Sequence, residues 1–201
     1  MKISRYIKFP LIFGLLMTFP TIFLNSAPTL NQFLLSFIYG AVFGVGMQIY
    51  SDYRTRKIKP DAGEKDFDIQ QTKQKFLLCS YDEAFNLCLE SVTFLKKGNV
   101  TYSDQENGII AAKTGMTWNS FGTDIDFRLK SITDNATEIS ISAKPILATT
   151  LIDGGESVEA VKTITDFLAR KNEDLNYKIL EEKFEIPIEY ISQNAKTTIK
   201  N

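Results

Sequence analysis

The sequence reads FPLIFGLLMTFPTIFL at residues 9–24 and FLLSFIYGAVFGVGMQIY at residues 33–50, and neither run contains a charged side chain. Helices of this length measure roughly 24–27 Å, because an α-helix rises about 1.5 Å per residue. With their flanking residues they match a hydrocarbon core about 30 Å thick. The join between the runs is short and uncharged. We therefore predict a transmembrane hairpin at residues 1–53, with helices at about 7–25 and 30–50.

Basic side chains lie only at the two outer ends of this hairpin. Lys2, Arg5 and Lys8 precede the first uncharged run, and Arg54, Arg56, Lys57 and Lys59 follow the second. Positive charge is retained on the cytoplasmic side of a membrane, which predicts a multi-pass protein of the inner (cytoplasmic) membrane with both termini in the cytoplasm. The four basic residues after the second run are expected to set this topology, and they are candidates for contact with lipid headgroups.

A cleaved signal peptide is the alternative interpretation of the first run. Residues 2–8 would form its basic segment, and residues 25–27 would form the cleavage motif. That motif begins with a large polar residue and is followed directly by Pro28, which disfavours cleavage. The basic residues at 54–59 would hold the rest of the chain in the cytoplasm in either case.

Small residues recur at intervals of four in both runs and are expected to pack the hairpin. The packing residues are Pro10, Gly14 and Thr18 in the first run and Ser36, Gly40 and Gly44 in the second. Residues four apart share one helix face, where small side chains let two backbones approach closely. An antiparallel hairpin then pairs Thr18 with Ser36, Gly14 with Gly40 and Pro10 with Gly44. Dimerisation through Gly40-x-x-x-Gly44, which would give a homo-oligomer, is the alternative.

Composition excludes several classes of site. The chain has no histidine, so it lacks histidine general bases and histidine-containing metal sites. Its two cysteines, Cys79 and Cys88, are too few for a four-cysteine site. Residues 61–201 carry 16 basic against 23 acidic side chains, which argues against nucleic acid as a partner. We therefore assign no metal, no cofactor and no catalytic residue.

Behind the hairpin, the hydrophobic pattern predicts an α+β domain with the element order β-α-β-β-β-β-α. Strands are expected near residues 74–79, 100–102, 109–112, 124–132 and 138–143, and helices near residues 80–97 and 156–171. The domain would span residues 71–172, after a charged linker at 54–70 and before a partly docked tail at 173–201. This order, with an antiparallel sheet and both helices on one face, is similar to that of TATA-binding-protein-like and helix-grip folds.

Two segments of the domain carry a more specific pattern, AKTGMTWNSFG at residues 112–122 and KPILATTLID at residues 144–153. They resemble a group of uncharacterised membrane-anchored bacterial proteins, which have a T-G-M-x-W-x-S-x-G-like turn and a Pro-x-x-x-T-T connector. The resemblance covers roughly residues 75–170. It implies a small α+β cytosolic domain at a bacterial membrane, and the group has no assigned activity.

Trp118 and Phe121 are the candidate ligand or interface residues. They are the single tryptophan and a phenylalanine in a loop between Gly115 and Gly122. One hypothesis places them in the membrane interface or at the mouth of a groove. The alternative is that they cap the open end of the sheet core, where most aromatic side chains are found.

Carboxylates are the remaining candidates for catalysis. Asp124 and Asp126 share one face of a predicted strand, but they alternate with Arg128 and Lys130. This alternation favours a solvated face with cross-strand ion pairs over an acid–base pair.

Together these patterns favour a non-enzymatic binding or accessory protein anchored in the inner membrane. Its partners would be the lipid bilayer and, at the membrane face, either another protein or an amphipathic ligand. An enzyme that uses carboxylates alone and a membrane-permeabilising oligomer of hairpins are the alternatives.

Overall fold

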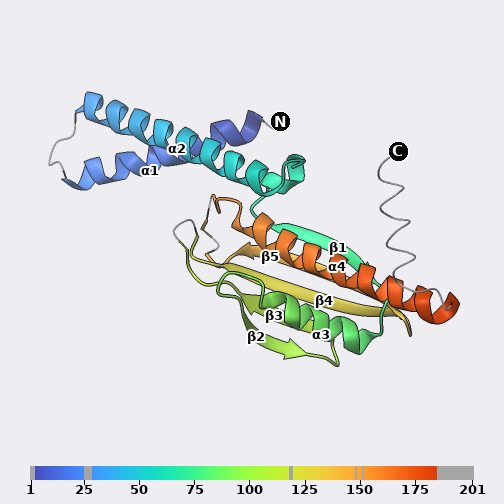
Figure 1. Cartoon of the computed structure of the whole chain (residues 1–201). Coiled ribbons are helices and arrows are strands. Elements are labelled where there is room, and N and C mark those ends of the chain that lie inside the picture. The colour runs from blue at the N-terminus through green and yellow to red at the C-terminus, as the bar shows by residue number, and fades with distance from the viewer. Residues whose placement is uncertain (1–2, 25–28, 118–119, 148, 151, 185–201) are drawn as a thin grey trace, which may run out of the picture. The chain divides into compact units, whose positions relative to one another are not determined.

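The computed structural model describes residues 3–184 except 25–28, 118–119, 148 and 151, with side chains described from Tyr6 to Phe23 in the first helix and up to Leu175 in the last. In chain order, the described elements are α1 (Ile3–Leu24), α2 (Leu30–Ile58), the 3-10 turn η1 (Glu64–Phe67), β1 (Gln71–Leu77), α3 (Tyr81–Val92), β2 (Asn99–Asp104), β3 (Ile109–Lys113), β4 (Thr123–Thr133), β5 (Ala136–Pro145) and α4 (Glu156–Phe184) (Figure 1). The order β-α-β-β-β-β-α behind a helical hairpin confirms the predicted α+β class.

The chain divides into two compact units. The hairpin unit comprises residues 1–71, 116–123 and 144–159, and the sheet unit comprises residues 72–115, 124–143 and 160–201. Two loops of the α+β region therefore belong to the same unit as α1 and α2.

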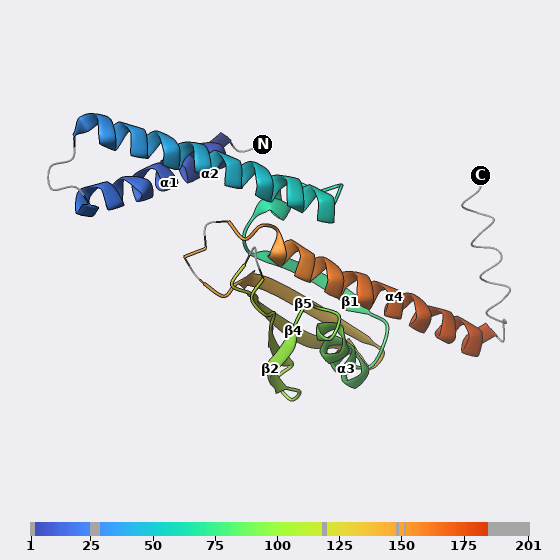
Figure 2. The ribbon, with the colours of Figure 1, turned by 60° about the vertical axis from the view of Figure 1, so that its left-hand side comes forward.

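The hairpin unit is built on α1 and α2, which lie side by side in both views (Figures 1 and 2). Each helix is long and apolar enough to cross a bilayer, by length and composition. The second helix begins at a capping box, in which the Gln32 N–H donates to Thr29 Oγ1 at 3.4 Å and the Thr29 N–H donates to Gln32 Oε1 at 2.9 Å. This cap satisfies backbone groups that the start of a helix leaves unpaired.

Glycines bring the two helices together. A Cβ built on Gly40 would lie 2.9 Å from the Cα of Gly14, and a Cβ on Gly44 would lie 3.0 Å from the Cα of Pro10. The structure thus brings together two of the three residue pairs that the spacing suggests. Thr18 and Ser36, the third pair, are half-buried on their own helices.

The second helix is longer than the hydrophobic run that predicts it. It continues through the basic segment to Ile58, so residues 54–58 are helical and do not form a linker. Lys59 is extended because Pro60 follows it and disfavours helical geometry at the preceding residue. The rest of the expected linker is also folded, since Asp66 is 7% exposed and accepts hydrogen bonds from Lys59 Nζ and the Gly63 N–H, both at 2.8 Å.

The sheet has the strand order β1-β5-β4-β3-β2. β2 pairs antiparallel with β3, β3 pairs antiparallel with β4, and a turn at Asp134 and Asn135 joins β4 to β5. On the outer face, Lys113 Nζ lies 3.5 Å from Asp124 Oδ1, and these two residues are direct partners across β3 and β4. One of the alternating charges of β4, Asp124, therefore takes part in a cross-strand ion pair.

The core lies between the other face of the sheet and the helices α3 and α4 (Figure 2). Alternate residues of the central strands point into it, and the largest of them are Ile125, Phe127, Ile139 and Ile141, each 0% exposed. The last helix contributes Ile164 and Leu168, which are also fully buried. Side chains therefore fill the space between this face and α4 in the part of the chain that is described.

The first helix of the domain is shorter than predicted and ends at Val92. Ser91 Oγ donates to the Cys88 carbonyl at 2.6 Å, and Thr93 Oγ1 donates to the Glu90 carbonyl at 2.7 Å. These hydroxyls compete with backbone N–H groups for the carbonyls at the end of the helix. The chain then folds back, and Gly98 packs directly on the carbonyl of Val92, where a side chain would clash.

The last helix is longer than predicted and continues to Phe184, so residues 173–184 of the expected tail are helical. Asn172 Oδ1 accepts a hydrogen bond of 2.8 Å from the Leu78 N–H, and Leu175 packs against the core. The expected tail at 173–201 is therefore docked at its start, and residues 185–201 lie outside the described residues.

Candidate functional site

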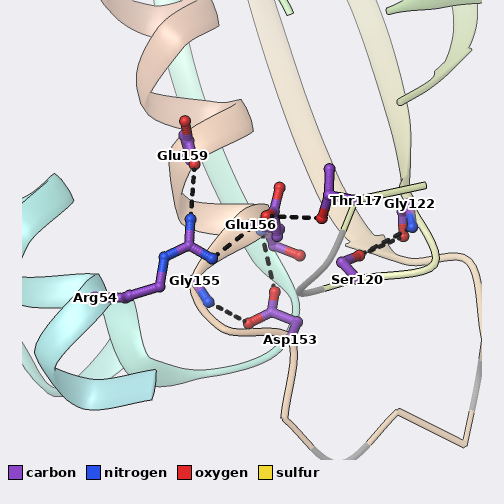
Figure 3. A network of polar contacts seen from close by, with 9 residues as sticks. Arg54, Thr117, Ser120, Gly122, Asp153, Gly155, Glu156 and Glu159 are labelled. Atoms are coloured by element: carbon purple, nitrogen blue, oxygen red, sulfur yellow. Dashed lines mark hydrogen bonds and ion pairs between the residues drawn. The ribbon is translucent and has the colours of Figure 1, made fainter. Parts of the chain in front are cut away.

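The start of α4 is organised by one buried carboxylate. Asp153 is 7% exposed and accepts hydrogen bonds from the Gly155 N–H at 2.9 Å and the Ser157 N–H at 3.1 Å (Figure 3). Gly154 and Gly155 have φ values of +61° and +80°, a conformation that other residues rarely adopt. The sequence Asp-Gly-Gly therefore forms a tight turn whose aspartate caps the helix.

Arg54 joins the end of α2 to this turn. Its Nη1 lies 3.4 Å from Glu156 Oε1 and its Nη2 lies 3.3 Å from Glu159 Oε2 (Figure 3). The three side chains are 17%, 11% and 27% exposed. The turn before α4 packs closely on α2, since a Cβ on Gly155 would lie 3.1 Å from Thr55 Oγ1.

The same network holds the loop at residues 116–122. Thr117 Oγ1 donates to Glu156 Oε1 at 3.2 Å, and the Gly122 N–H donates to Ser120 Oγ at 2.9 Å (Figure 3). The Ile146 N–H donates to the Gly122 carbonyl at 3.1 Å, which joins this loop to the connector before α4.

These two joined loops carry exposed apolar side chains. Met116 is 63% exposed, Phe121 is 63% exposed and Leu147 is 42% exposed. We call these three residues the apolar loop surface. Phe121 is therefore too exposed to cap the sheet core. Its role in the membrane interface or at the mouth of a groove stays a prediction. Trp118 lies outside the described residues.

A pocket of about 190 Å³ lies in the hairpin unit. Its polar lining comes from Gln48 and Ser51 of α2, Asp68 after η1 and Asp153 before α4. Its apolar walls are Phe9, Phe67, Ile69 and Ile152. The pocket is smaller than the sites that hold drug-sized molecules, which occupy about 300–1,000 Å³, and larger than one water molecule at about 30 Å³.

Gln48, one of the residues at this pocket, has a buried side-chain amide that is only partly hydrogen-bonded. It is 4% exposed, and its Nε2 donates to Asp52 Oδ1 at 2.7 Å. Tyr6 donates its hydroxyl to the other oxygen of Asp52. A carboxylate only accepts, so the amide must turn its nitrogen toward Asp52. Gln48 Oε1 is then left buried without a hydrogen-bond partner among the described residues.

Sequence reasoning missed this polar cluster, although two signals were available. Gln48 and Asp52 are one helical turn apart near the end of an apolar run, and Asp153 precedes a Gly-Gly pair at a helix start. That Gln48 and Asp153 line one pocket could not be read from the sequence, because they lie on segments that are far apart in the chain.

Three of the four basic residues expected at lipid headgroups contact other side chains of the protein. Arg54 binds two carboxylates, Arg56 lies 5.2 Å from the centre of the Phe67 ring, and Lys59 pairs with Asp66 at 2.8 Å. Lys57 is exposed. These contacts give three of the four residues a structural role, and they leave the predicted topology role untouched.

The cysteines are packed within the core. Burial raises the pKa of Cys79 to about 11, with a smaller contribution from the Glu83 carboxylate, and raises the pKa of Cys88 to about 12. Both thiols are therefore protonated and unreactive at neutral pH. Among the residues that are described, no group of three or more Cys, Asp or Glu side chains is placed to hold a metal ion.

Comparison with known proteins gives no assignment. No protein-family model matches the chain, and no curated protein matches it. Solved structures that resemble it include a START superfamily protein from Mycobacterium smegmatis (9% identity, 53% of this chain and 98% of that chain, TM-score 0.37) and Ara h 8.0201 (9% identity, 50% and 97%, TM-score 0.35). A third is the Zhui aromatase/cyclase from Streptomyces sp. R1128 (10% identity, 53% and 88%, TM-score 0.32). With TM-scores below 0.5, these similarities support no assignment of function.

Proposed function

We propose that this chain is a non-enzymatic accessory protein of the bacterial inner membrane, anchored by α1 and α2 with both termini in the cytoplasm. The support is the length and apolar composition of the two helices, together with basic residues at their outer ends only. Large apolar side chains on both helices are exposed, among them Leu15, Phe23, Leu34 and Val42. Lipid would cover them in a membrane.

We further propose that the apolar loop surface recognises amphipathic lipid at the membrane face. The observation that carries this proposal is the bonded path from Arg54 through Glu156 to Thr117, within the hairpin unit. This path ties a loop with exposed Met116 and Phe121 to the end of a membrane helix. Exposed apolar side chains next to an anchor are typical of contact with the bilayer interface.

The filled core of the sheet unit supports a surface site over an interior one. Phe127, Ile139 and Ile164 occupy the face that a ligand of the sheet and α4 would need, and each is 0% exposed. In the same proposal the sheet and α4 form a helix-grip arrangement without an interior ligand site. Core side chains fill the space between the sheet and the helix. The resemblance to membrane-anchored bacterial proteins stays a further expectation of this proposal.

The single tryptophan of the chain provides the test, because Trp118 lies in sequence between Met116 and Phe121. The full chain would be reconstituted in vesicles that contain lipids brominated at defined depths. We expect bromines near the headgroups to quench Trp118 and acrylamide in the water to quench it weakly. A matched control is Trp118→Phe with Tyr102→Trp, which places the single tryptophan on exposed β2.

Two outcomes would contradict lipid recognition. If brominated lipid quenched the native chain and the control equally, the loop would be no closer to the lipid than β2 is. Strong quenching by acrylamide without quenching by brominated lipid would place the loop in water, and would favour a protein partner for the apolar loop surface.

Topology has its own test. Protease added to intact cells should leave the region beyond residue 60 whole, and the same protease should digest it in inverted membrane vesicles. The intact mass of the mature chain separates the hairpin from a cleaved signal peptide, because cleavage after residue 27 would remove the first run.

The two alternative functions, a carboxylate enzyme and a membrane-permeabilising oligomer, each require a feature that can be checked. A carboxylate enzyme needs an acid–base pair, whereas Glu156 and Glu159 share Arg54, and Asp124 pairs with Lys113. A membrane-permeabilising oligomer predicts leakage from dye-loaded vesicles. Vesicles that stay tight at high protein density would support the anchor.

A further inference from the structure

The loop between α3 and β2 holds a lysine in a strained backbone conformation. Among the described residues, Lys97 is the only residue other than glycine with a positive φ, at +53°. Glycine and asparagine adopt this conformation at a lower cost than lysine does. The fold does not need a lysine at this position, which points to a role for the exposed side chain itself.

The side chain of Lys97 lies across Gly115. The Gly115 N–H donates to the Lys97 carbonyl at 3.1 Å, and a Cβ built on Gly115 would lie 2.8 Å from Lys97 Cδ. A larger residue in place of this glycine would therefore push the lysine aside. Met116, the first residue of the apolar loop surface, follows Gly115 directly in the chain. The backbone thus holds Lys97 at the base of the loop for which we propose a lipid contact.

A second lysine lies beside the first. Lys113 pairs with Asn99 where β2 begins and β3 ends. The hydrogen bond between Gly115 and Lys97 continues this pairing two residues further. Lys97 and Lys113 are therefore diagonal neighbours on two antiparallel segments, at positions that lie roughly 7–8 Å apart. Their side chains are long and flexible, so both ammonium groups can reach one phosphate group.

Asp124 is the carboxylate that faces Lys113. Its Oδ1 lies 3.5 Å from Lys113 Nζ, and the lysine side chain is 51% exposed. Ion pairs at such exposure are weak, so the ammonium group can still donate to a second anion. Lys96, which precedes Lys97, is exposed as well. Three lysines against one carboxylate make this patch locally basic, although residues 61–201 carry more acidic than basic side chains.

We propose that Lys97 and Lys113 bind the phosphate of anionic phospholipids. This inference rests on the lipid contact proposed for the apolar loop surface, and it names the class of lipid. The cytoplasmic leaflet of a membrane is negatively charged and attracts basic side chains close to its surface. A domain that is otherwise acidic meets this leaflet most favourably through its basic patch. Zwitterionic lipid, whose own cation offsets the phosphate, should bind less well.

Trp118 reports which lipid lies nearest to the loop, because it is the single tryptophan of the chain. The full chain would be reconstituted in an equimolar mixture of anionic phosphatidylglycerol and zwitterionic phosphatidylcholine. In one sample only the phosphatidylglycerol carries bromine, and in the other only the phosphatidylcholine does. We expect brominated phosphatidylglycerol to quench Trp118 more strongly. Salt at about 1 M should remove the difference, because it screens charges more than about 3 Å apart.

Two variants remove the charges while the backbone is retained. Lys97→Asn introduces a residue that tolerates a positive φ, and Lys113→Gln keeps a polar side chain at an exposed position. Each should lower the relative affinity for phosphatidylglycerol about fivefold at low salt, as the ratio of the two quenching values reports. The matched control is Lys130→Gln, an exposed lysine roughly 20 Å along β4 from Asp124. It should leave the relative affinity unchanged.

The outcomes separate this inference from the lipid contact on which it rests. Equal quenching by the two brominated lipids would leave the contact in place and overturn the anionic preference. Quenching by neither lipid would contradict the contact itself, and this inference with it. An equal loss of preference in Lys130→Gln would overturn the site, because charge anywhere on the domain would then suffice. A lower urea midpoint with unchanged preference in Lys97→Asn would assign Lys97 a structural role near the end of α3, and would also overturn the site.

Discussion

Arg54 Nη1 lies 3.4 Å from Glu156 Oε1, although 102 positions separate the two residues in the chain. The same guanidinium reaches Glu159 through its second terminal nitrogen. One fork-shaped cation therefore holds the first turn of α4 against the end of α2. A lysine in its place would offer a single point charge rather than two directed donors.

Replacement of Arg54 is expected to loosen this turn. Arg54→Ala leaves two largely buried carboxylates without their cation, which should destabilise the local structure by about 1–3 kcal/mol. Hydrogen exchange of the full chain in micelles should become faster at residues 153–159. Lys57→Ala, at an exposed position on the same helix, is the control and should change nothing. Unchanged exchange in Arg54→Ala would show that the ion pairs contribute no stability.

The contact between α1 and α2 predicts a contrast between two glycines of one helix. Gly40→Ala would press a methyl group against the backbone of Phe13 and Gly14, whereas a Cβ on Gly46 would meet no described atom within 4 Å. We expect Gly40→Ala to destabilise the hairpin by about 1–3 kcal/mol and Gly46→Ala to be tolerated. Thermal unfolding in micelles measures both. Similar stability of the two variants would argue against the close packing of Gly40.

The turn between β2 and β3 requires a glycine for two reasons. Gly108 has a φ of +66°, and a Cβ there would lie 2.5 Å from the Leu129 carbonyl oxygen. Gly108→Ala should therefore lower the free energy of unfolding by about 1–3 kcal/mol. Gly63→Ala, where the nearest atom is 3.7 Å away, is the matched control. Equal urea midpoints for the two variants would contradict this assignment.

The buried thiols predict a loss of stability at alkaline pH. Burial raises the pKa of Cys88 to about 12 in the folded chain, above the ordinary value of about 8.5 that it takes when unfolded. The protonated thiol therefore stabilises the fold fully below about pH 8.5, and this contribution is lost as the pH rises toward 12.

The measurement is urea unfolding between pH 8 and pH 11. The difference in stability between the native chain and Cys88→Ala should fall by about 1.4 kcal/mol per pH unit above about pH 9, in the direction that favours the variant. Titrating groups that do not interact with Cys88 cancel in this difference. A difference that does not change with pH would show that Cys88 ionises as easily in the folded chain as in the unfolded one.

Much of the architecture could be predicted because its signals are local. The alternation of charge and apolar residues in β4 and β5 depends on a period of two, which only a half-buried strand satisfies. Helix lengths were harder to predict, because packing extends or shortens a helix beyond its own pattern. Residues 54–57 are polar and yet helical, while α3 ends at Val92 despite a further apolar residue at Leu95.

The sequence by itself determined the class of the protein. The two uncharged runs, the asymmetric basic residues and the element order are properties of neighbouring residues, and short-range hydrophobic and steric preferences suffice to express them. Only the tertiary structure decided the candidate sites. Gln48, Asp68 and Asp153 come from three separate segments, and the unpaired oxygen of Gln48 exists only because Asp52 holds its amide in place. Such a site depends on long-range packing, which no local pattern encodes.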